Sequence, residues 1–155
     1  MKKTELTSTG KRPELVEAIP DYDRDFFAWT QETARAIEAG RFEEIDRVAL
    51  ADEVESLGKC DRREIVRRLA TIITHLLKTK YQPEKQTRSW QNTIKRERRE
   101  LDLLLADSPS LKAQLPELLA VAYGNARRDA ANETGLGIDA FPETCEWTVA
   151  ELLGA

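Results

Sequence analysis

The sequence contains few of the residues that carry familiar chemistry in small proteins. It has one histidine and two cysteines, so the paired Glu-x-x-His motifs of a ferritin-like metal centre and a disulfide scaffold are both excluded. Seven glycines and six prolines exclude collagen-like and low-complexity chains. The chain has no glycine-rich phosphate loop, no serine nucleophile elbow and no apolar run near the ~20 residues of a membrane span. These absences exclude several classes of protein, but they do not identify a reaction. We expect no cofactor.

The same scarcity bears on where the protein works. Lys2 and Lys3 resemble the start of a signal peptide, but residues 4–10 supply no apolar segment. Cys60 and Cys145 are far from any CxxC spacing, and we expect both to be unreactive small side chains. We therefore expect a cytoplasmic protein in a reducing compartment, with no membrane contact.

What is present indicates a globular, helical chain. Of the 155 residues, 41% are hydrophobic and 34% charged, and the length fits one domain of ordinary size. We predict an all-α fold, a compact single-domain bundle of about five main helices with no sheet. Residues 21–155 form this domain, and residues 1–20 form a poorly ordered N-terminal arm.

Apolar residues recur every three or four positions, the spacing of helices that bury one face. Gly40 and Gly135 fit the positions at which helices stop, and Gly58 is expected to interrupt or end a helix. The alanine-rich last long helix packs either inside the monomer or across a two-fold axis. Helices are predicted at residues 21–38, 47–57, 61–80, 89–106 and 117–133, with short ones after Pro109 and near residues 149–153. We expect Asp21 to cap the first of these helices and Thr148 the last.

Charge is distributed unevenly along the chain. Residues 1–58 carry a net charge of −6 and residues 100–155 a net charge of −7, whereas residues 59–99 hold 13 basic and four acidic residues, a net charge of +9. This basic segment either pairs with the acidic segments inside the fold or faces an anionic partner. The candidate nucleic-acid face consists of Arg63, Arg67, Lys95 and Arg99.

Glu53 places a carboxylate on an apolar helix face, because it lies between Leu50 and Leu57 at helical spacing. A buried charge without a partner is costly, so we expect an ion pair with His75, Lys78 or Arg88. The alternative is a metal site built on Glu53 and His75, and we favour the structural ion pair.

Donors and aromatic residues gather around the segment from His75 to Trp90. Tyr81 or Trp90 could stack a base there, although the helical spacing favours the core for Trp90. We treat the group as a polar cluster with either a structural or a binding role: Glu53, His75, Lys78, Tyr81, Gln82, Arg88, Ser89 and Trp90.

Ordered motifs along nearly the whole chain also suggest a relative. They are Asp25–Trp29, Gly40–Phe42, Leu50–Gly58, His75–Lys78, Tyr81–Glu84, Arg88–Trp90, Thr93–Ile94, Ala131–Leu136 and Phe141–Cys145. In these motifs the sequence resembles a bacterial family catalogued as domain of unknown function twenty-nine. The resemblance implies a compact, single-domain, all-helical protein, and it implies no activity, substrate or catalytic residue.

Three hypotheses for function follow. The leading one is a non-catalytic helical binding or protein-interaction module, whose partner is another protein or a second copy of the chain. The second is association with nucleic acid through the basic segment 59–99. The third is a metal-dependent enzyme around Glu53 and His75.

Overall fold

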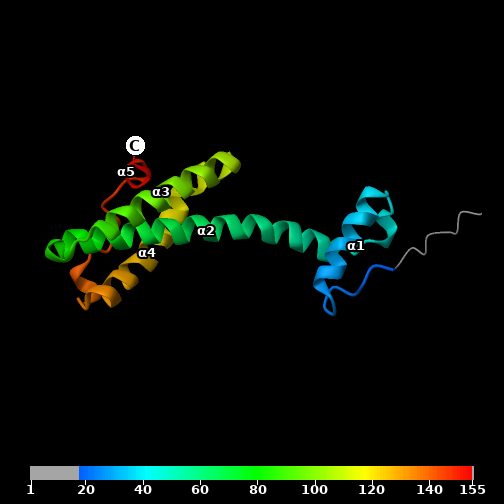
Figure 1. Cartoon of the computed structure of the whole chain (residues 1–155), viewed down its shortest axis with the longest axis horizontal. Helices are drawn as coiled ribbons and strands as arrows, with labels where there is room; N and C mark the ends of the chain where they lie inside the picture. The colour runs from blue at the N-terminus through cyan, green and yellow to red at the C-terminus, as the bar shows by residue number, and fades with distance from the viewer. Residues whose placement is uncertain (1–17, 155) are drawn as a thin grey trace, which may run out of the picture. The chain divides into compact units, whose positions relative to one another are not determined.

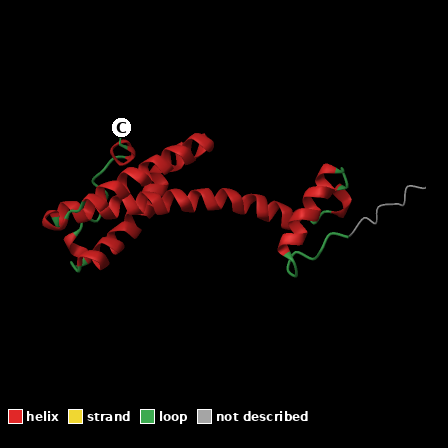
Figure 2. Cartoon of the chain, viewed as in Figure 1, coloured by secondary structure: helices red, strands yellow, loops and turns green. Residues whose placement is uncertain are grey.

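The computed structural model describes residues 18–154, and all of their regular structure is helical (Figure 2). Five α-helices and four short 3₁₀ helices occur in this range and no strand does, which confirms the predicted all-α class. None of the described helices is both long enough and apolar enough to cross a membrane. The arm predicted for residues 1–20 lies outside the described residues except at its last three positions.

The chain divides into two units at Val54 and Glu55. We call residues 18–54 the N-terminal unit and residues 55–154 the C-terminal unit, and each is described by itself. The single domain over residues 21–155 stays a prediction.

In the N-terminal unit, helix α1 (Phe26–Glu38) begins five residues later than Asp21, the predicted cap. The backbone carbonyl of Asp21 instead accepts from the amides of Arg24 and Asp25 and closes a turn. The cap is Asp25, whose side chain accepts from the amide of Ala28 at 3.0 Å. A left-handed Gly40 follows α1, as predicted, and the 3₁₀ helix η1 (Phe42–Glu44) comes next.

Aromatic packing holds the start of the N-terminal unit together. Trp29 is buried, and the ring of Tyr22 meets it edge-on at 5.0 Å between centroids. Tyr22 also meets Phe26 edge-on at 5.5 Å, while Phe26 stacks on Trp29 at 5.9 Å. Edge-on and offset contacts of this kind are the favoured geometries of aromatic pairs.

Helix α2 (Arg47–Tyr81) corrects the sequence prediction, because it runs through Gly58 without a break. The side chain of Asp46 caps its start by accepting from the amides of Val48 and Ala49 at 3.0 and 3.1 Å. Gly58 has no positive φ, and a glycine inside a helix costs only about 1 kcal/mol relative to alanine. The two helices predicted at residues 47–57 and 61–80 are therefore one helix.

The C-terminal unit packs the rest of α2 beside α3 (Arg88–Asp107) and α4 (Leu115–Thr134), as Figure 1 shows. Short 3₁₀ helices link these elements: η2 (Pro83–Lys85), η3 (Pro109–Gln114) and η4 (Ile138–Ala140). The chain ends with α5 (Val149–Leu153), whose start is closed by the predicted cap Thr148 in a reciprocal capping box with Glu151. The largest fully buried side chains are Ile65, Leu69, Ile72, Ile73, Leu77, Leu101, Phe141 and Leu152.

The alanines of α4 face this core. Ala122, Ala126 and Ala130 are fully buried, and the hydroxyl of Thr74 lies 3.4 Å from the carbonyl of Ala126. Small side chains let α2 and α4 approach closely at this point. Of the two alternatives for the alanine-rich helix, the structure shows packing inside the chain.

Replacing Gly58 by alanine should stabilise the protein. A Cβ at this position meets no atom within 4 Å, so the substitution should raise the free energy of unfolding by about 0.5–1 kcal/mol in urea titrations followed by circular dichroism. Gly135→Ala is the matched control, because its φ of 74° should make the same change destabilising by about 1 kcal/mol. A loss of stability in Gly58→Ala would contradict the continuous helix.

Candidate functional site

The structure distributes the predicted polar cluster over both units. In the N-terminal unit, the hydroxyl of Tyr22 donates to the carboxylate of Glu53, and this hydrogen bond raises the pKa of Tyr22. The sequence predicts His75, Lys78 or Arg88 as the partner of Glu53, whereas the structure gives it Tyr22. The hydroxyl comes from the turn that precedes α1, which helical spacing alone does not place beside α2.

Three members of the cluster meet in the C-terminal unit. The ring of His75 lies edge-on to Trp90 with 6.3 Å between centroids, and the Lys78 ammonium lies 4.4 Å from the Trp90 centroid. Lys78 is buried and donates to the carboxylate of Glu133 at 2.5 Å, a partner that the sequence analysis did not assign. Trp90 is only half-buried, so it borders the core. These contacts tie α2 to the start of α3 and the end of α4.

The next residues of the cluster extend this connection. The ring of Tyr81 packs edge-on against Phe141 at 5.0 Å, and the Gln82 amide donates to the carbonyl of Thr134 at 3.1 Å. Arg88 and Ser89 are exposed at the start of α3. The packed members of the cluster thus join the ends of three helices.

Glu97 is the buried carboxylate that the sequence analysis missed. Its side chain is 5% exposed and accepts from Arg68 at 2.7 Å and from Arg96 at 2.8 Å. Burial by itself would raise the pKa of Glu97, but hydrogen bonds from Arg96 and Arg68, with their charges, lower the pKa below its usual value. The signal was present, because Glu97 lies between Ile94 and Leu101 at the same spacing that marks Glu53.

Removing the Glu97 charge should destabilise the C-terminal unit. Glu97→Gln leaves the nearly buried Arg68 with Glu64 as its remaining carboxylate partner, so the free energy of unfolding should fall by about 2–3 kcal/mol. The matched control is Glu100→Gln, which removes an outer ion pair with Arg99 and should change the free energy by less than about 0.5 kcal/mol. Equal effects in chemical denaturation would contradict a structural role for the buried pair.

The same pair should make stability depend on acid pH. Because folding lowers the pKa of Glu97, its contribution is complete above the unfolded value of 4.5 and is lost as the pH falls through the folded pKa. The difference in unfolding free energy between the wild type and Glu97→Gln should therefore narrow when denaturation is repeated below pH 4.5. A difference that stays constant would show that Glu97 does not titrate with folding.

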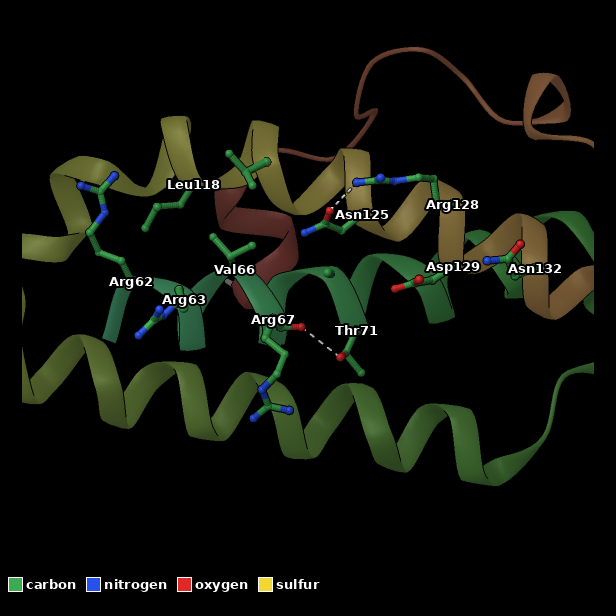
Figure 3. A pocket seen from close by; sticks show the side chains of 12 residues that line it. Arg62, Arg63, Val66, Arg67, Thr71, Leu118, Asn125, Arg128, Asp129 and Asn132 are labelled. Carbon is green, nitrogen blue, oxygen red and sulfur yellow. Dashed lines mark hydrogen bonds between the residues drawn. The ribbon is translucent and has the colours of Figure 1, made fainter. Parts of the chain in front are cut away.

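A groove of about 880 Å³ lies between α2 and α4 in the C-terminal unit (Figure 3). Its apolar lining comes from Val66 and Ala70 on α2 and from Leu118 and Val121 on α4. Polar and charged side chains complete the lining: Arg62, Arg63, Arg67, Thr71, Asn125, Arg128, Asp129 and Asn132. Four arginines and one aspartate give the lining a positive charge.

The arginines of the groove differ in how they are held. Arg62 bridges the two helices by donating to Glu117 at 3.0 Å, and Arg128 donates to Asn125 at 2.7 Å. Arg67 pairs with Glu64 on its own helix, and the hydrogen bonds that it donates to this carboxylate raise the pKa of its guanidinium. The side chain of Arg67 is nevertheless 61% exposed, so its remaining donors are accessible to a ligand.

A second hollow of about 530 Å³ continues the groove, because it shares Arg128 and Asn132 with the first. It adds Leu136 and Ile138 from the segment after α4, both partly exposed. Sequence patterns do not reveal the groove, because its lining joins residues 62–71 of α2 to residues 118–132 of α4, and α3 separates these two helices in the sequence.

The four residues of the candidate nucleic-acid face are all exposed. Arg63 and Arg67 lie on α2 and line the groove, while Lys95 and Arg99 lie on α3. The structure therefore places half of this candidate face in the groove.

For the metal hypothesis, Glu53 and His75 have separate surroundings. Glu53 accepts from Tyr22 in one unit, and His75 contacts the Thr71 carbonyl at 2.9 Å in the other. Within residues 18–154, no group of three or more histidine, cysteine, aspartate or glutamate side chains is arranged to hold a metal ion.

Comparison with known proteins gives one family. The model of a family described as "Domain of unknown function DUF29" matches residues 22–155, so the chain belongs to this family. No curated protein and no solved structure matches the chain.

Proposed function

We propose that this member of the DUF29 family is a non-catalytic interaction module that binds an acidic, amphipathic helix of a protein partner in the groove between α2 and α4. The observation that supports the proposal is the combination of an apolar floor with arginines on both sides. Amphipathic helices bind proteins by laying an apolar face into grooves of this kind.

The length of the groove suits a helix. Its lining on α4 extends from Leu118 to Asn132, which at a rise of ~1.5 Å per residue is about 21 Å. A partner helix of about 14 residues has the same length. Leu118 is buried at the bottom, whereas Val121 is 53% exposed and available for a new contact.

The charge of the groove favours carboxylates. Guanidinium groups bind carboxylates in a planar, two-point arrangement and lose little hydration in doing so. Arg63, Arg67 and Arg128 line the groove, and a glutamate beside the apolar face of the partner would reach this rim.

Nucleic-acid association is the second candidate function, because Arg63, Arg67, Lys95 and Arg99 are all exposed. Phosphate binding would use the arginines and lysine of both α2 and α3, and it would weaken steeply as salt rises. The groove adds apolar surface that a phosphate backbone does not need, so the protein partner is the proposal we argue.

The proposal also includes the cellular location of the protein. We place the protein in a bacterial cytoplasm, on the family resemblance and on its two cysteines. Cys60 and Cys145 are free thiols in the structure, which suits a reducing compartment.

Fluorescence anisotropy should distinguish the two candidates. The probes are a labelled helical peptide of about 14 residues, with leucines along one face and glutamates beside them, and labelled single strands of DNA and RNA of roughly 16 nucleotides. We expect Arg63→Glu/Arg67→Glu to weaken peptide binding about tenfold or more, because it reverses the rim of the groove.

Lys95→Glu/Arg99→Glu is the matched control, since it reverses the same number of exposed charges outside the groove. We expect this control to bind the peptide as the wild type does. Tight, salt-steep binding of the nucleic acids that both double variants weaken, without peptide binding, would replace the proposal with the second candidate.

A further inference from the structure

Helix α1 carries an apolar face that the N-terminal unit leaves exposed. At about 100° per residue, Phe26, Phe27, Ala34 and Ile37 fall within one sector of the helix, beside the sector that buries Trp29. Phe26 is 49% exposed, Phe27 73% and Ile37 41%. A contiguous exposed face of large apolar side chains is typical of an interaction surface.

The small size of the N-terminal unit supports this interpretation. Among residues 18–54, the buried hydrophobic residues are Trp29, Ala36 and Ile45. Units of fewer than about 40 residues usually need a cross-link, a metal or a partner to be stable. Covering the exposed face of α1 would supply the missing apolar contacts.

Charge indicates which surface covers it. Residues 18–54 hold ten acidic and four basic residues, a net charge of −6, and Glu38 borders the exposed face of α1. The groove between α2 and α4 carries the opposite charge on an apolar floor. Residues 1–17 hold four basic and three acidic residues, so the start of the chain lacks this complementarity.

The dimensions agree as well. Helix α1 has 13 residues and a length of about 20 Å, against about 21 Å for the groove along α4. Both surfaces are present in every copy of the chain, and a symmetric dimer would contain the contact twice.

We infer that the groove between α2 and α4 of one copy holds α1 of a second copy, with Phe27 on the apolar floor and the acidic residues of the N-terminal unit beside the arginine rim. This inference rests on the proposed function, because it names the helix that the groove binds.

Sedimentation velocity of the full chain over a range of concentrations tests the inference. The wild type should change from monomer to dimer as its concentration rises. Phe27→Ser and Arg63→Glu/Arg67→Glu should each raise the dissociation constant about tenfold or more. The matched controls are Leu103→Ser, an apolar side chain 55% exposed on α3, and Lys95→Glu/Arg99→Glu, and both should dimerise as the wild type does.

Circular dichroism melting of each variant confirms that it folds.

Two results would overturn the inference: a wild type that is monomeric at every concentration, or a dimer that both interface variants leave unchanged. A contact between α1 and the groove of the same chain would be independent of concentration. The wild type would then be monomeric at every concentration, which is the first of these two results. If the monomeric wild type still binds the acidic peptide, the inference fails and the proposed function stands. If peptide binding is absent as well, both fail.

Discussion

The C-terminal unit depends on the burial of one side of α2. Ile65, Leu69 and Ile72 are fully buried, and this fixes the rotation of the helix against α3 and α4. Once the rotation is fixed, the direction in which each charged side chain projects from α2 is fixed as well. Arg68 then faces Glu97 on α3, while Arg63 and Arg67 line the groove.

The basic segment of the sequence is consequently divided between two uses. Lys78 is buried in its ion pair with Glu133, and Arg98 donates at 2.8 Å to the carbonyls of Glu151 and Leu152 at the end of α5. These cations stabilise contacts between elements of the unit, and the second also suits the negative end of a helix dipole. Arg63 and Arg67 stay exposed and give the groove its charge. From the sequence, internal ion pairing of the basic segment and an exposed basic surface are alternatives. The structure contains both.

The sequence predicts the features that depend on local chemistry. The all-helical class follows from the apolar spacing, the end of α4 from a left-handed Gly135, and the start of α5 from the cap Thr148. It does not predict the continuity of α2, because the cost of one glycine is small beside the packing of a long helix. The partners of Glu53 and Glu97 are not predictable from the sequence either. Helical spacing identifies both carboxylates, but only the tertiary structure brings Tyr22 to Glu53 and Arg68 to Glu97.

The groove lies beyond sequence reasoning for the same reason. Its floor joins Val66 to Leu118, residues that come together only when α2 and α4 are packed. Methyl NMR spectroscopy of the full chain with the acidic helical peptide tests its role most directly. The account predicts that the methyl resonances of Val66, Leu118 and Val121 shift on addition of the peptide while those of Leu103 do not. Shifts at Leu103 with none in the groove would contradict it.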